Sequence, residues 1–152
     1  MKKIYLLICI VALASCKSKK ITTAPKVEKI ETPAEVSDFQ KSRAYELGKR
    51  VLNTCNTSKF KPFTTNEATE KVIQNTTLER LSSTCSKYLI KYGKFEDINL
   101  VEIVRTDDNS LVFRYKANYQ RKFTQKELQV TLNSENKVAA IKSTDWSDIY
   151  IP

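Results

Sequence analysis

The 152-residue sequence contains no histidine. Histidine is the side chain whose pKa lies nearest to neutral pH, and it is a frequent zinc ligand, so its absence removes the commonest general base and a common metal ligand together. No other group of side chains in the sequence stands out as a catalytic or metal-binding set. The sequence therefore predicts no catalytic residue, no metal site and no cofactor.

The sequence also lacks a hydrophobic run long enough to cross a membrane as a helix. Residues 4–14 are apolar, but they number about half of the roughly 20 residues that a bilayer requires. Residues 1–3 (Met-Lys-Lys) bring positive charge before this run, and residues 13–16 (Leu-Ala-Ser-Cys) close it. The pattern resembles the signal peptide and lipobox of bacterial lipoproteins, which implies that residues 1–15 are removed and that Cys16 carries lipid. The alternative is an ordinary secretory signal with an incidental cysteine at its end.

The segment that follows the expected anchor is polar and poor in structure signals. Residues 17–37 are rich in Lys, Thr, Pro and Glu and show no sustained apolar period. We therefore expect residues 16–37 to be the lipidated cysteine and a disordered tether, which leads to a single domain over residues 38–152. Lys17 stands where an aspartate retains lipoproteins in the inner membrane of Gram-negative bacteria. By that resemblance the protein is lipid-anchored in the cell envelope, at the outer membrane and facing the periplasm.

Only two of the four cysteines remain for the folded domain. Cys9 leaves with the signal peptide and Cys16 carries the lipid, so Cys55 and Cys85 are left. Outside the cytoplasm two such thiols oxidise where the geometry permits, and a bridge that closes about 30 residues stabilises a fold by roughly 3 to 4 kcal/mol. The alternative is two buried, unpaired thiols that behave as small apolar side chains.

Three helices are expected in the first half of the domain. Apolar residues recur at helical spacing over residues 38–56, and capping-box spacing opens a short helix over about 64–75. A third helix is expected over about 76–92, closed by a left-handed residue at Gly93. The two expected capping boxes are Thr64 with Glu67 and Thr76 with Glu79. The apolar faces are Ala44, Leu47, Val51 and Cys55 in the first helix and Leu78, Leu81, Cys85, Tyr88, Leu89 and Tyr92 in the third.

Beyond Gly93 the apolar period changes from about 3.6 residues to about 2, which is typical of half-buried strands. The clearest case is residues 111–119. The other expected strands are 98–105, 127–132 and 138–143. Turn residues between them indicate hairpins and an antiparallel meander. Helices followed by strands predict an α+β fold, in which N-terminal helices pack on a curved antiparallel sheet of about four strands.

Several stretches of the domain are similar to the cone-shaped fold of nuclear transport factor 2, also called cystatin-like, which occurs in many uncharacterised bacterial lipoproteins. The similarity covers about residues 40–148. It rests on residues 91–95 (KYGKF), 111–117 (LVFRYKA), 128–132 (LQVTL), 137–141 (KVAAI) and Trp146. The resemblance implies a cone-like domain, and the candidates for its lining are Tyr88, Tyr92, Phe113, Tyr115, Tyr119 and Trp146. Because these motifs are mostly packing residues, they imply a fold and no activity.

A lipid-anchored cone of this kind is expected to be a non-enzymatic binding module of the cell envelope. Its lipid anchor makes the membrane one partner, and its interior or surface would bind a small hydrophobic ligand or another envelope protein. Its secreted location argues against nucleic acid as a partner.

Two alternatives remain open. Enzymes of the ketosteroid-isomerase kind use a carboxylate of raised pKa and a phenol as oxyanion donor, and Asp145 with Tyr115 or Tyr119 is the best such pair. The second alternative is a basic module that contacts cell-wall polymer or anionic lipid, because the chain carries 26 basic and 17 acidic side chains. The residues expected on this basic outer sheet surface and its rim are Arg114, Lys116, Arg121, Lys122 and Lys126.

Overall fold

The computed structural model describes residues 28–30, 36–122 and 125–152. The predicted signal peptide, Cys16 and most of the predicted tether lie outside this part of the chain. The described elements are β1 (Glu28–Ile30), α1 (Asp38–Thr57), α2 (Glu70–Asn75), α3 (Leu78–Tyr92), β2 (Phe95–Arg105), β3 (Leu111–Tyr119), β4 (Lys126–Leu132) and β5 (Val138–Asp145). Helices that precede and pack against an antiparallel sheet confirm the predicted α+β class.

The sheet is antiparallel throughout and has the strand order β1-β2-β3-β4-β5. Both predicted hairpin turns are formed, with Asn109 and Asn136 at φ values of 61° and 59°. Asparagine tolerates this left-handed region better than most residues. The strand β1 was not predicted: Glu28–Ile30 pairs with residues 103–105 of β2, inside the segment expected to be an unstructured tether. The sheet therefore begins earlier in the chain than the composition indicates.

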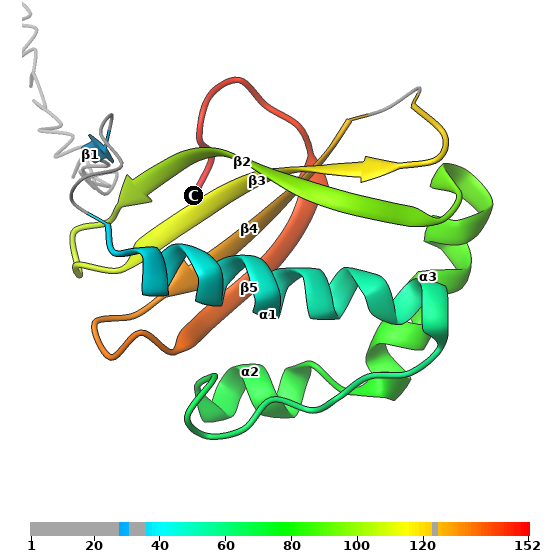
Figure 1. Cartoon of the computed structure of the whole chain (residues 1–152), viewed down its shortest axis with the longest axis horizontal. Helices are drawn as coiled ribbons and strands as arrows, with labels where there is room; N and C mark the ends of the chain where they lie inside the picture. Colours follow the sequence, from blue (N-terminus) through cyan, green and yellow to red (C-terminus); the bar gives the residue numbers. More distant parts are fainter. Residues whose placement is uncertain (1–27, 31–35, 123–124) are drawn as a thin grey trace, which may run out of the picture.

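The helix α1 runs across one face of the sheet (Figure 1). It begins at a capping box, in which the Gln40 N–H donates to Ser37 Oγ at 3.3 Å and the Ser37 N–H donates to Gln40 Oε1 at 3.1 Å. Gly48 lies directly against β4, because a Cβ at this position would be 2.8 Å from Val130 Cγ2 and 2.9 Å from Leu128 Cδ2. The space between α1 and the sheet is therefore filled by packed side chains at this point.

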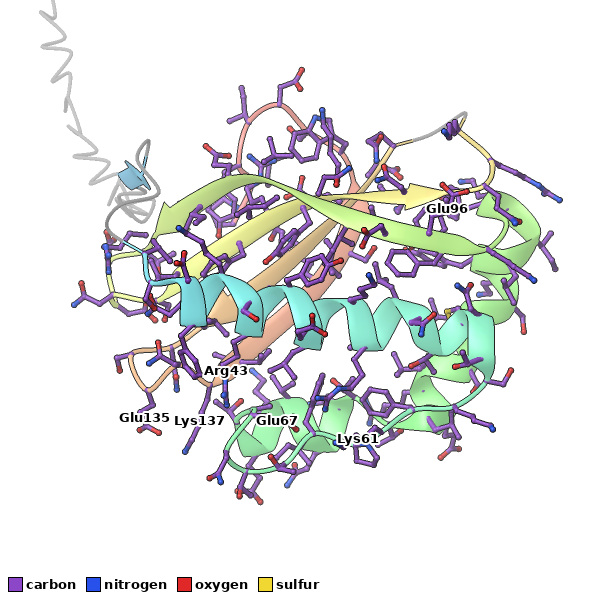
Figure 2. The ribbon with its side chains drawn as sticks, in the orientation of Figure 1. Arg43, Lys61, Glu67, Glu96, Glu135 and Lys137 are labelled. Carbon is purple, nitrogen blue, oxygen red and sulfur yellow. A yellow bond between two sulfur atoms is a disulfide. The ribbon has the colours of Figure 1, made fainter. Side chains whose placement is uncertain are left out.

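The helix α2 begins later than predicted. Half of the expected capping box is present, since the Thr64 N–H donates to Glu67 Oε2 at 2.9 Å. This hydrogen bond closes a single isolated turn and does not start a helix. The chain then leaves the helical path because Ala68 forms a parallel bridge with Val138 at the start of β5. Glu67 itself lies beside this turn, near α2 (Figure 2), and Arg50 of α1 donates to its two carboxylate oxygens at 2.7 and 3.1 Å.

The helix α3 ends at Tyr92 as predicted and begins slightly later than predicted. Thr77 rather than Thr76 is the N-cap, and its hydroxyl accepts from the Arg80 N–H at 3.3 Å. Gly93 ends the helix with a positive φ of 76°, as predicted, but its ψ of −162° is extended rather than left-handed helical. This conformation leads the chain straight into β2, which therefore begins at Phe95, earlier than predicted.

The strand β3 is buried on both faces, although the sequence predicted a half-buried strand. Its odd-numbered residues, such as Phe113 and Tyr115, belong to the core beneath the helices. Its even-numbered residues Val112 and Arg114 are buried as well. The C-terminal segment after β5 loops back over the strands (Figure 1), and the Ser147 carbonyl accepts a hydrogen bond from Arg114 at 2.6 Å. The end of the chain thus covers the outer face of the sheet at Arg114.

Candidate functional site

A cleft of about 300 Å³ lies between α3 and the edge of the sheet. Its lining residues are Val51, Leu52 and Cys55 of α1, Leu81, Thr84 and Tyr88 of α3, Leu128 of β4, and Ile141 and Ser143 of β5. Five of these side chains are hydrocarbon and none carries a formal charge. The volume lies at the lower end of the roughly 300 to 1,000 Å³ that small-molecule pockets occupy. The cleft is therefore suited to a small, apolar ligand.

The cleft exists because α3 buries only part of its apolar face. Cys85 and Tyr92 of this face are buried, whereas Leu81 and Tyr88 are half-buried. The Tyr88 and Ser143 hydroxyls lie 3.2 Å apart and hydrogen bond, which joins α3 to β5. A helix face that the sequence assigned to the core thus forms one wall of an open cleft.

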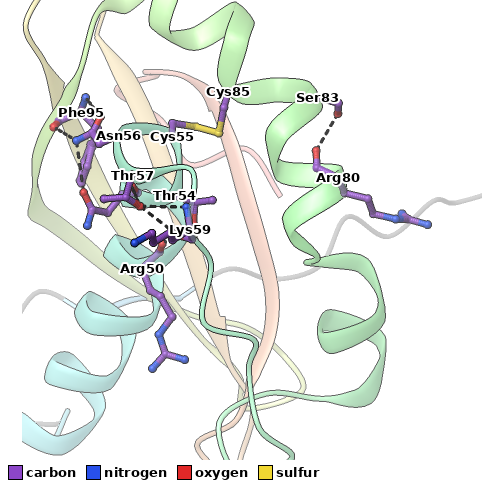
Figure 3. The surroundings of a disulfide bond; sticks show 11 residues. Arg50, Thr54, Cys55, Asn56, Thr57, Lys59, Arg80, Ser83, Cys85 and Phe95 are labelled. Carbon is purple, nitrogen blue, oxygen red and sulfur yellow. Dashed lines mark hydrogen bonds between the residues drawn. A yellow bond between two sulfur atoms is a disulfide. The ribbon is translucent and has the colours of Figure 1, made fainter.

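The disulfide between Cys55 and Cys85 holds the two helices of the cleft together, which confirms the predicted bridge. Figure 3 shows that it joins the end of α1 to α3. The adjacent residue Asn56 donates to the Phe95 carbonyl at 2.7 Å and accepts from the Phe95 N–H at 3.0 Å. The same end of α1 is therefore tied both to α3 and to β2.

The aromatic residues predicted to line a cone do not share one cavity. Tyr88 lines the cleft. Tyr92 and Tyr119 pack beside it, with ring centroids 5.2 and 6.1 Å from that of Tyr88. Phe113 and Tyr115 are buried in the core, with 0% and 1% of their surface exposed. Most of the predicted lining is therefore packing, and one of its members reaches the cleft.

The hydroxyls of Tyr115 and Tyr119 are buried and have no hydrogen-bond partner among the described residues. Burial raises the pKa of both phenols, so both stay protonated at neutral pH. Neither residue is among those that line the cleft. The two phenols therefore add no polar group to it.

Asp145 does not form the acid–base pair with Tyr115 or Tyr119 that the isomerase alternative requires. The Asp145 carboxylate accepts a hydrogen bond from the Lys126 ammonium at 2.9 Å, and its side chain is 73% exposed. This hydrogen bond lowers the pKa of Asp145, whereas the isomerase reaction requires a carboxyl group whose pKa is raised. Lys126 reaches Asp145 because the two residues are direct cross-strand neighbours in β4 and β5.

The outer face of the sheet carries a buried ion cluster that the sequence analysis missed. Arg114 is 1% exposed, and its Nε and Nη2 donate to the two carboxylate oxygens of Glu127 at 2.8 and 2.9 Å. Its Nη1 also donates to Glu102. The ring centroids of Trp146 and Tyr150 lie 4.9 and 5.7 Å from Arg114 Cζ. Trp146 therefore belongs to this cluster and not to a cone lining, which corrects its predicted place.

The outer sheet face is consequently not the free basic surface predicted. Arg114 is neutralised inside the cluster, and Lys126 points to the helix side, where its ammonium lies 5.7 Å from two tyrosine ring centroids. Lys116 is half-buried, and Arg121 and Lys122 are exposed just after β3. Of the five cationic residues expected on this surface, only Arg121 and Lys122, just after β3, are exposed.

Comparisons with protein-family models, with curated proteins and with solved structures find no match to this chain. The resemblances to bacterial lipoproteins and to the nuclear transport factor 2 fold therefore stay predictions. Within residues 28–30, 36–122 and 125–152, no helix combines the length and the apolar character needed to span a bilayer. The same residues contain no cluster of three or more Cys, Asp or Glu side chains placed to hold a metal ion.

Proposed function

We propose that this chain is a lipid-anchored module of the bacterial cell envelope, which binds a small hydrophobic ligand without catalysis in the cleft between α3 and β5. The observation that carries the proposal is the cleft, in which five hydrocarbon side chains surround about 300 Å³ of open space. Apolar surface that faces water in a concave site is typical of ligand-binding pockets. The disulfide and the Asn56 contacts hold the walls of this site in place.

The disulfide also supports the proposed location, because structural disulfides persist mainly in oxidising compartments outside the cytoplasm. The proposal places lipid on Cys16 and the domain at the outer membrane, facing the periplasm. Since β1 pairs with β2 from Glu28 onward, residues 17–27 separate the proposed anchor from the sheet in sequence.

Neither alternative has comparable support. The carboxylate–phenol pair nominated for an isomerase-like enzyme is not formed, because Asp145 is paired with Lys126 and is largely exposed. A basic module that meets cell-wall polymer or anionic lipid lacks much of its charged face, because the Arg114 guanidinium is buried against two carboxylates. The cleft is the site that the geometry favours.

The variant Thr84→Trp tests the site. Thr84 lines the cleft from an exposed position on α3, so an indole there should occupy the cleft without disturbing the core. We expect the mature chain, made soluble by Cys16→Ala, to bind the fluorescent probe N-phenyl-1-naphthylamine, and Thr84→Trp to bind it at least tenfold more weakly. The matched control is Ser86→Trp, which is exposed on α3 outside the lining and should bind as the parent does. Equal binding by all three proteins would contradict the proposal.

The variant Cys16→Ala in the full chain tests the anchor. We expect the wild-type protein to incorporate labelled fatty acid and to enter the detergent phase of Triton X-114, and the variant to lose both properties. Persistent lipid labelling of the variant would overturn the assignment of the anchor to Cys16.

A further inference from the structure

The cleft carries hydroxyl groups but no charge. Besides its apolar side chains, its lining contains Thr84, Tyr88 and Ser143, and no Asp, Glu, Lys or Arg is among the lining residues. Burial of an unpaired charge against such a surface is far more costly than burial of a neutral polar group that finds a hydrogen-bond partner. The lining therefore discriminates against ligands whose charge enters the cleft.

The charged groups beside Tyr88 are already paired with each other. The Lys126 ammonium lies 5.7 Å from the Tyr88 ring centroid and donates to the Asp145 carboxylate at 2.9 Å. The two charges already offset each other, so a ligand of either sign gains little net Coulombic attraction from the pair. Ligand charge of either sign thus finds no unpaired partner in this ion pair.

Tyr88 and Ser143 place a pair of hydroxyls where α3 meets β5. The two oxygens lie 3.2 Å apart, and one hydroxyl donates to the other. A pair of this kind uses one of its two protons internally, so one proton and several lone pairs remain for a ligand. A ligand hydroxyl or carbonyl can take the place of water there without leaving a polar group unsatisfied. The site therefore offers one neutral polar contact next to an apolar cleft.

We propose that the ligand is a neutral single-chain amphiphile, whose hydroxyl or carbonyl group binds the Tyr88–Ser143 hydroxyl pair while its hydrocarbon chain fills the cleft. The inference rests on the proposed function and specifies its ligand class. The cleft of about 300 Å³ is open to solvent, so it accommodates an alkyl chain of medium length without fixing that length. Ten-carbon ligands are therefore suitable probes.

Competition between three ligands of one chain length tests the inference. The mature Cys16→Ala chain is loaded with N-phenyl-1-naphthylamine at pH 7, and 1-decanol, decanoate and decylammonium are titrated in, the alcohol below its solubility limit and the two ions below their micelle-forming concentrations. We expect 1-decanol to displace the probe at a concentration at least tenfold lower than either charged ligand. Tyr88→Phe and Ser143→Ala should each weaken the binding of 1-decanol by about two- to tenfold, which is the change in affinity that one net hydrogen bond gives. Ser86→Ala, outside the lining, is the matched control and should leave it unchanged.

The outcomes separate this inference from the function on which it rests. If decanoate or decylammonium competes as well as 1-decanol, the neutral-ligand inference is wrong, while loss of probe binding in Thr84→Trp still upholds the cleft as the site. If neither hydroxyl variant changes the competition by 1-decanol, the role of the Tyr88–Ser143 pair is wrong. If the parent chain does not bind the probe, the proposed function itself fails.

Discussion

Loss of the Cys55–Cys85 disulfide should destabilise this domain strongly, because the bond closes a long loop. The two cysteines are 30 positions apart in the sequence. In the chain-entropy model, the entropy that the bond removes from the unfolded chain is 2.1 plus 1.5R ln n cal/mol/K, which is about 12 cal/mol/K for n of about 30. At 25 °C this corresponds to a loss of about 3.6 kcal/mol in the free energy of unfolding.

The same magnitude predicts a shift in melting temperature. Unfolding entropy is about 2.1 cal/mol/K per residue near 60 °C, so a domain of about 115 residues has an unfolding entropy of about 240 cal/mol/K. A loss of about 3.6 kcal/mol then lowers Tm by about 15 °C. In the double variant Cys55→Ala/Cys85→Ala, truncation of the buried Cys85 side chain should lower the free energy of unfolding by at most about 1 kcal/mol more.

Calorimetric unfolding of four samples measures this effect: the wild-type protein and the double variant, each with and without dithiothreitol. Reduced wild-type protein and the double variant should melt close together and well below the oxidised protein, and dithiothreitol should not affect the variant. Equal Tm values for oxidised and reduced wild-type protein would refute the loop-entropy argument. Two reactive thiols in the denatured, unreduced protein would refute the disulfide itself.

Two further predictions concern ion pairs. The Arg50 hydrogen bonds lower the pKa of Glu67 from 4.5 to about 2. The contribution of this pair to the free energy of unfolding is therefore complete above pH 4.5 and is lost as the pH falls towards 2. Glu67→Gln should therefore flatten the decline in unfolding free energy between pH 4.5 and 2, and an unchanged slope in urea denaturation at several pH values would count against this pair. Glu127→Gln should lower the unfolding free energy by about 3 kcal/mol, the low end for a broken buried pair, because a second carboxylate still contacts Arg114. Asp145→Asn, whose side chain is 73% exposed, should cost much less than Glu127→Gln, and similar losses in the two variants would contradict the burial argument.

Local patterns predicted most of the architecture, since they depend on residues that are near in sequence. The helical stripe over α1, the period-two alternation over β3 and the asparagine turns all appear at about their predicted positions. The disulfide was predictable too, because the expected anchor and signal peptide leave only Cys55 and Cys85 to pair. The first residues of the helices and strands were less predictable. For example, α2 begins later than predicted because Ala68 forms a bridge with Val138, far along the chain.

The site depended on contacts between distant segments, so its residues were only partly predictable. The six aromatic residues proposed as a lining have the right apolar character, but alternation does not tell whether a buried ring meets a cavity or another ring. Only Tyr88 among them lines the cleft. Ser143 and Thr84 carried no signal of their own in the sequence, since isolated hydroxyl residues on strands and helices are common.

The sequence by itself determined the class of fold and the order of the helices and strands from α1 onward, because periodicity and capping residues act over a few residues. It also left Cys55 and Cys85 as the pair, by elimination of the other two cysteines. Tertiary structure alone decided where the charges lie. Alternation placed Arg114 on the face away from the core, and the sequence suggested a solvated basic surface there. The return of the chain after β5 buried that face, and the strand register set Glu102 and Glu127 beside the guanidinium. Burial and register are properties of the assembled sheet, and they turned an expected exposed cation into the centre of a buried ion cluster.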